Sequence, residues 1–195
     1  MAQGAIEQYE RVDFIKEYGV VPLSIWDTDN PQFSRPILAH LRERRGESTR
    51  ENTLSSFGGA GERTAFTATA SYFNPFLCRI VYSSYCPKGG RVFDPFASVV
   101  RPYVAQLMGF DYTGCEVRPD EAEKIASFLA SSSPLLGDGD GKASVLNIDC
   151  REFQGEGFDL VFTCPPYWNL EKYSDIPADL SNVDDYESFL YQMSF

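Results

Sequence analysis

Three acidic residues and one proline-rich turn stand out because each directly follows a short apolar run. The acids are Asp94, Glu116 and Asp149, and the turn is Cys164-Pro165-Pro166-Tyr167. Carboxylates accept hydrogen bonds from hydroxyl and amino groups. Two consecutive prolines force an extended, rigid backbone whose carbonyl oxygens can point at one place. Together these residue types predict a ligand site built from hydrogen-bond acceptors.

The four features lie at the ends of four predicted strands that alternate with helices. Apolar runs predict strands at 91–94, 112–117, 143–148 and 158–163, and proline or glycine signals predict helices at 76–82, 99–108 and 120–130. This alternation predicts an α/β fold with a mostly parallel sheet in the spatial order 3-2-1-4 and helices on both faces. Ligands bind beyond the carboxyl ends of such strands, so the four features should share one site. For any single acid, capping a helix or solvating a loop is an equally good explanation.

In this order and spacing, the residues resemble the S-adenosylmethionine-dependent DNA methyltransferases that modify amino groups. The likeness rests on Asp94-Pro95-Phe96-Ala97, Gly114-Cys115-Glu116-Val117, Asp149 and Cys164-Pro165-Pro166-Tyr167. The segments Ser71-Tyr72-Phe73-Asn74-Pro75-Phe76-Leu77 and Leu170-Glu171-Lys172-Tyr173-Ser174-Asp175 are similar to a phage and prophage DNA methylase group. The resemblance covers about residues 70–195 and implies a Rossmann-like methyltransferase fold.

The same resemblance implies a cofactor, S-adenosyl-L-methionine, and the residues that hold it. Glu116 would accept hydrogen bonds from the ribose hydroxyls, and Asp149 from the exocyclic amine of the cofactor's adenine. The other implied cofactor-binding residues are Phe73, Pro75, Asp94, Pro95, Phe96 and Ala97. Phe73 and Pro75 would lie along the amino-acid end of the cofactor.

The resemblance also implies DNA as the partner and Cys164, Pro165, Pro166 and Tyr167 as the catalytic residues. Carbonyl oxygens of this turn would accept hydrogen bonds from the target amine, cytosine N4 or adenine N6, and so expose the nitrogen lone pair to the methyl group. Tyr167 would stack on a base flipped out of the duplex, because the target atom is unreachable inside the stack. The transfer is direct and needs no covalent nucleophile, so Cys164 is not interpreted as one; a packing thiol is its alternative role.

Two positions depart from the family pattern. Relatives carry glycines after Asp-Pro-Phe-Ala, whereas this chain has Ser98-Val99-Val100-Arg101-Pro102. Valine resists positive φ angles, and proline lacks an amide donor. The loop therefore predicts weakened cofactor binding. The second departure is Cys164, where relatives carry Asp, Asn or Ser; a thiol is a weak acceptor, so the main-chain carbonyl would do more of the work.

The predicted organisation is an N-terminal extension of loops and short helices at 1–70 and a partial methyltransferase core at 71–195. A full core has about seven strands, so the fold is expected to be truncated at its C-terminus, with target recognition beyond 195 or in residues 28–71. The chain is then either a truncated or weakened DNA methyltransferase of the restriction-modification kind, or a non-catalytic methyltransferase-like binding module. An open edge on the fourth strand would favour self-association.

Composition excludes several other classes of protein. The net charge of −11 argues against a free-standing binder of the DNA backbone, which needs clustered Lys and Arg. The five cysteines form no CxxC pair and the chain has one histidine, so no metal site is predicted and reduced thiols in the cytoplasm are expected. No apolar run approaches the ~18 residues of a membrane span.

Overall fold

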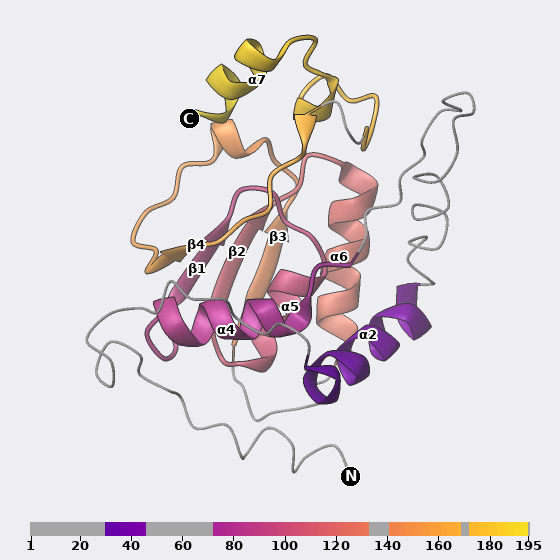
Figure 1. Ribbon diagram of the computed structural model, residues 1–195, viewed down its shortest axis with the longest axis vertical. Helices are drawn as coiled ribbons and strands as arrows, with labels where there is room; N and C mark the ends of the chain where they lie inside the picture. The colour runs from indigo at the N-terminus through magenta and orange to yellow at the C-terminus, as the bar shows by residue number, and fades with distance from the viewer. Residues whose placement is uncertain (1–29, 46–71, 133–140, 169–171, 195) are drawn as a thin grey trace.

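The sheet consists of four parallel strands, as the computed structural model shows for residues 30–45, 72–132, 141–168 and 172–194 (Figure 1). The strands are β1 (Arg91–Asp94), β2 (Asp111–Cys115), β3 (Ala143–Leu146) and β4 (Leu160–Val161). Their order is β3-β2-β1-β4, and every pairing is parallel. The predicted parallel sheet and its spatial order are therefore confirmed, although β4 is only two residues long.

Five α-helices accompany these strands in the described parts of the chain. They are α2 (Pro31–Arg45), α4 (Pro75–Tyr85), α5 (Val100–Leu107), α6 (Pro119–Ser131) and α7 (Tyr186–Met193). Two 3₁₀-helices, η3 (Cys150–Glu152) and η5 (Leu180–Asn182), follow β3 and precede α7. None of the helices that the structure describes is long and apolar enough to span a lipid bilayer.

Local signals at the helix ends explain where α4, α5 and α6 begin and end. The Asn74 side chain caps α4 by accepting hydrogen bonds from the amides of Phe76 at 2.8 Å and Leu77 at 3.2 Å. Proline occupies the first position of both α4 and α6, where its missing amide proton has no intrahelical partner. Gly109, which follows α5, adopts a φ of 78°, a left-handed conformation that glycine allows without strain.

The glycine-free loop after Ala97 avoids positive φ angles altogether. Val99 has a φ of −73° and a helical conformation, and α5 begins directly after it. Pro102 then lies in the first turn of α5, where an amide proton would have no partner within the helix. The local backbone thus accommodates the β-branched residues and the proline at the start and in the first turn of α5.

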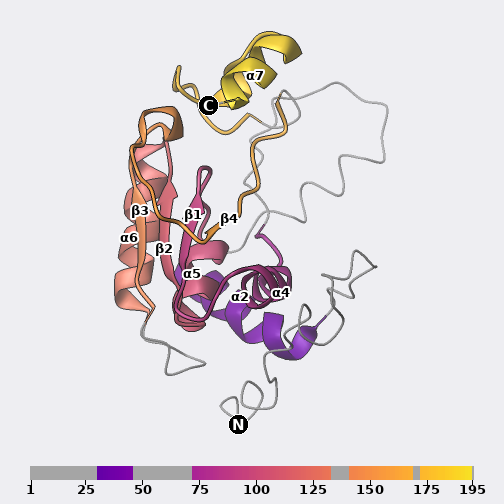
Figure 2. The ribbon, with the colours of Figure 1, turned by 90° about the vertical axis from the view of Figure 1, so that its left-hand side faces the viewer.

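Helices α4, α5 and α6 lie on one side of the sheet, and α2 packs on α4 (Figures 1 and 2). The prediction of helices on both faces is therefore wrong for the described residues. Right-handed crossovers from β1 to β2 and from β2 to β3 run in the same direction and place their helices on the same face. The return from β3 to β4 would place a helix on the other face, but it consists of η3 and an extended segment.

The hydrophobic core fills the space between this helical layer and the sheet. Val92 and Tyr112 point from the strands into the core, and the helices contribute a larger set: Phe33, Ile37 and Leu41 from α2, Cys78 and Tyr82 from α4, Val100, Tyr103 and Val104 from α5, and Ile125, Phe128 and Leu129 from α6. Because α2 belongs to this core, part of the predicted N-terminal extension packs against the predicted partial core. Residues 1–29 and 46–70 of that extension lie outside the described residues.

The opposite face of the sheet is covered only in part by described residues. The Phe93 ring stacks against those of Phe153 and Phe158, with ring centroids 4.7 and 5.1 Å away. Leu146 and Val161 on the same face are 39% and 61% exposed. The sheet is thus strongly asymmetric, with one dry face and one partly open face.

Candidate functional site

A cavity of about 920 Å³ lies at the carboxyl ends of the strands, the position expected for a ligand site in a parallel sheet. Nine of the twelve predicted site residues line it: Phe73, Pro95, Phe96, Ala97, Glu116, Asp149, Cys164, Pro166 and Tyr167. Pro75, Asp94 and Pro165 are not among its lining residues. The strand ends therefore bring most of the predicted cofactor residues and most of the turn to one place.

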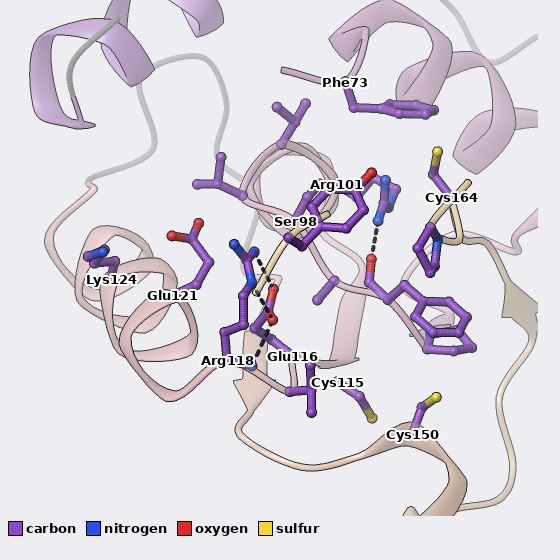
Figure 3. A pocket seen from close by; sticks show the side chains of 18 of the residues that line it. Phe73, Ser98, Arg101, Cys115, Glu116, Arg118, Glu121, Lys124, Cys150 and Cys164 are labelled. Carbon is purple, nitrogen blue, oxygen red and sulfur yellow. Dashed lines mark hydrogen bonds and ion pairs between the residues drawn. The ribbon is translucent and has the colours of Figure 1, made fainter. Parts of the chain in front are cut away.

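Glu116, directly after β2, is 8% exposed and is held by a neighbouring arginine. Its Oε1 accepts from the backbone amide of Arg118 at 2.9 Å and from Arg118 Nε at 3.0 Å, while its Oε2 accepts from Arg118 Nη2 at 3.0 Å. Figure 3 shows the Arg118 side chain alongside Glu116 at the wall of the cavity. Burial alone would lower the pKa of Arg118, but the hydrogen bonds and charge of Glu116 raise it.

Asp149, after β3, has the same kind of partner two residues later. It caps η3 by accepting from the Arg151 amide at 3.0 Å, and Arg151 Nε lies 2.9 and 3.1 Å from its two oxygens. The hydrogen bonds from Arg151 hold the pKa of Asp149 below its ordinary value. Arg151 also donates to the carbonyl of Ala178 at 3.3 Å and to Gln192 Oε1 on α7. The cavity carboxylate is therefore linked to the C-terminal part of the chain.

Asp94, at the end of β1, is completely buried. Its Oδ2 accepts from Arg101 Nε and from the Tyr112 hydroxyl, both at 2.6 Å. Its Oδ1 accepts from the Phe96 amide at 3.1 Å and from Thr163 Oγ1 at 2.6 Å. The prediction that Asp94 faces the cavity with Glu116 and Asp149 is wrong, because these four donors enclose its carboxylate within the protein.

The Cys-Pro-Pro-Tyr turn borders the cavity where the strand β4 has ended. Cys164 and Pro166 line the cavity, and the Tyr167 side chain is 54% exposed at its border, with its hydroxyl 3.5 Å from Cys164 Sγ. Trp168 follows with a φ of 50°, and its indole Nε1 donates to the Val183 carbonyl at 2.9 Å. A half-exposed ring beside a cavity is available for stacking on a planar ligand.

Residues 173–182 form another wall of the cavity and are held by their own polar side chains. Buried Asp179 accepts from the Ser174 hydroxyl at 2.7 Å, from the Ser181 hydroxyl at 2.7 Å and from the Ser181 amide at 3.0 Å. The Asn182 side chain donates to the carbonyls of Ser174 and Ile176, each at 2.9 Å. Tyr173, Ala178, Asp179 and Leu180 of this segment line the cavity, so these hydrogen bonds fix one of its walls.

Sequence reasoning missed the three arginines that neutralise the strand-end acids. Arg118 and Arg151 each follow their acid by two residues, and that repeated spacing was a usable signal. Arg101 lies in the loop that was interpreted only through its missing glycines, yet it is 2% exposed and paired with Asp94. Burial alone would lower the pKa of Arg101, but the Asp94 carboxylate outweighs burial and raises it.

Two thiols that border the cavity, Cys115 and Cys150, are poor nucleophiles. Burial raises the pKa of Cys115 to about 12 and that of Cys150 to about 11, so both are protonated at neutral pH. Both side chains border the cavity beyond Glu116 (Figure 3). Within the described parts of the chain, no group of three or more His, Cys, Asp and Glu residues could hold a metal ion.

Comparison with known proteins adds no relative to this picture. No protein-family model matches the chain, and no curated protein and no solved structure is significantly similar to it. The functional argument therefore depends on the site itself.

Proposed function

We propose that the cavity binds S-adenosyl-L-methionine and that the protein transfers its methyl group to an exocyclic amine of DNA, cytosine N4 or adenine N6. One observation carries the proposal: Glu116, Asp149 and the turn residues Pro166 and Tyr167 border a single cavity. The volume of about 920 Å³ lies within the roughly 300–1,000 Å³ of small-molecule sites.

The acceptor capacity of the two cavity carboxylates fits a nucleoside ligand. A carboxylate offers about four lone-pair positions. Glu116 receives three hydrogen bonds from Arg118, which leaves about one position for a ribose hydroxyl. Asp149 receives four hydrogen bonds from Arg151, one from the amide, two from the shared Nε and one from Nη2, so an amine donor of the ligand would replace the longer Nε contact at 3.1 Å.

The residues of the chain would act by binding and orienting. The cofactor, when bound, supplies a methyl group on a positively charged sulfur. Carbonyl oxygens of the turn at 164–167 accept hydrogen bonds from the target amine and leave its lone pair directed at that methyl group. Tyr167, half-exposed at the border of the cavity, stacks on the extruded base. Phe73 and Phe96 give the cavity apolar walls that limit the access of water.

A non-catalytic, methyltransferase-like binding module is the second candidate. The observation that favours it is the pairing of each strand-end acid with an arginine of the same chain, at Arg101, Arg118 and Arg151. These pairs reduce the number of acceptors that a ligand can use. Such a module would bind a nucleoside weakly and would transfer no methyl group.

Two measurements separate these candidates. Isothermal titration with S-adenosylhomocysteine tests the cavity, and transfer of a radioactive methyl group from S-adenosylmethionine to unmethylated DNA tests the reaction. Binding together with transfer supports the methyltransferase. Binding without transfer supports the module, and no heat at millimolar ligand would refute both nucleoside proposals.

A further inference from the structure

The carboxylate of Asp94 has no acceptor position left for a ligand. A carboxylate offers about four lone-pair positions. Four donors of the chain fill them: the Phe96 amide, Thr163 Oγ1, Arg101 Nε and the Tyr112 hydroxyl. The side chain is 0% exposed and does not line the cavity. Glu116 and Asp149 differ from it, since both border the cavity and Glu116, with three hydrogen bonds, retains an acceptor position.

The four donors come from different parts of the fold. Arg101 belongs to α5, Tyr112 to β2, Phe96 to the loop after β1, and Thr163 to the segment after β4. Arg101 is fixed in turn, because its backbone carbonyl accepts from the Tyr82 hydroxyl on α4 at 3.0 Å. The Phe73 ring lies 5.1 Å from the Arg101 guanidinium. Asp94 is thus a junction at which the strand ends and the helical layer meet.

Thr163 gives this junction a direct connection to the turn. It immediately precedes Cys164-Pro165-Pro166-Tyr167, and its hydroxyl lies 2.6 Å from Asp94 Oδ1. A hydrogen bond to an ionised carboxylate is about twice as strong as a neutral one. The bond therefore holds the start of the turn against the end of β1.

The positive charge of Arg101 stabilises the buried Asp94 carboxylate at this junction. A buried carboxylate without a counter-charge is costly and tends to become protonated. Arg101 supplies that counter-charge from within the chain, with its Nε 2.6 Å from Asp94 Oδ2. An ammonium group of a ligand is not required at this position.

We propose that Asp94, neutralised by Arg101, is a positioning residue that holds the turn 164–167 through Thr163 and binds no ligand. This inference rests on the proposed function in one respect: it assumes that the turn contacts the target base. The position of the turn itself is testable without any activity.

The fluorescence of Trp168 reports the position of the turn, because Trp168 directly follows the turn and its indole Nε1 donates a hydrogen bond to the Val183 carbonyl. The chain has one other tryptophan, Trp26, so the experiment uses the full chain with Trp26→Phe. In that background, Thr163→Val removes the hydroxyl at nearly constant volume, and Thr163→Ser retains it. We expect Thr163→Val to shift Trp168 emission to the red and increase acrylamide quenching, and Thr163→Ser to restore both. Unchanged Trp168 spectra in the valine variant would overturn the proposal.

The second part of the experiment measures ligand binding and methyl transfer. Thr163→Val should leave the S-adenosylhomocysteine Kd within about threefold, less than the loss of one hydrogen bond would cause, and lower kcat roughly 10- to 100-fold through a misplaced turn. Thr163→Ser should recover kcat. Equal losses in affinity and kcat would overturn the proposal, because the junction would then serve the ligand. If the wild type binds no S-adenosylhomocysteine, the proposed function fails, while the Trp168 spectra still decide the positioning role.

Discussion

Replacing Glu116 by alanine tests the acceptor that the structure leaves available to a ribose. Glu116 already accepts three hydrogen bonds from Arg118, so about one lone-pair position remains for a ligand hydroxyl. The loss of one hydrogen bond to a charged group costs about 1.5–3 kcal/mol. We therefore expect Glu116→Ala to weaken S-adenosylhomocysteine binding by about 10- to 150-fold in Kd.

The fold should survive this change. Arg118 is 25% exposed, so its guanidinium can turn to water once the carboxylate is gone. The lost hydrogen bonds should cost about 1–3 kcal/mol of stability, which is less than the roughly 5–15 kcal/mol of an ordinary domain. Urea unfolding of the variant checks this expectation and separates a binding defect from unfolding.

Glu123→Ala is the matched control variant for Glu116→Ala, and isothermal titration with S-adenosylhomocysteine gives the Kd of both variants. Glu123 borders the same cavity and carries the same charge, but it is exposed on α6. Glu123→Ala should change the Kd for S-adenosylhomocysteine by less than about threefold, because an exposed charge contributes little. The reasoning is refuted if Glu116→Ala binds as tightly as wild type, or if Glu123→Ala weakens binding equally.

Three further predictions concern the turn, the sheet and the pH dependence of folding. Tyr167→Ala should weaken the binding of single-stranded DNA by about 1–3 kcal/mol, and Tyr167→Phe should retain it, because stacking needs the ring and not the hydroxyl. Equal losses of affinity in the two variants, measured by fluorescence anisotropy titration, would contradict stacking. Gly114→Ala should lower the free energy of unfolding in urea by about 1–3 kcal/mol, because the new Cβ would lie 2.7 Å from Ala97 Cβ and 2.8 Å from the Tyr112 ring. An unchanged urea midpoint of unfolding would contradict the close packing. Burial, followed by the charge of Arg44, lowers the pKa of His40 below 6.5, so the unfolded chain binds the proton more readily than the folded one. Stability should then fall as the pH drops through 6.5 and level off below the folded pKa. His40→Gln, followed by thermal melts across this range, should remove that step.

Much of the fold could be predicted from local sequence. Pro75 with Asn74, Pro119 and Gly109 mark helix ends by backbone chemistry that acts within a few residues, and the structure has α4, α5 and α6 at these signals. The strand order follows from alternation and the handedness of crossovers, which hold for parallel sheets in general. The placement of the acids and the turn at one edge follows from the same rules. Strand length was less predictable, because the predicted strand covers 158–163, whereas β4 pairs with β1 over only two residues.

Only the tertiary structure decided which of these residues face the cavity. Asp94, Glu116 and Asp149 have similar positions after their strands, yet Asp94 is enclosed by donors from α5, β2 and the segment after β4. Those donors are 7, 18 and 69 residues away, so no local pattern reveals that they meet. The same holds for the single helical layer, which depends on the connection between β3 and β4 containing only the 3₁₀-helix η3 and no α-helix. Sequence thus determined where the strands end and which chemistry their ends carry, whereas packing determined which carboxylate remains open to a ligand, because burial and hydrogen-bond saturation arise only when distant segments come together.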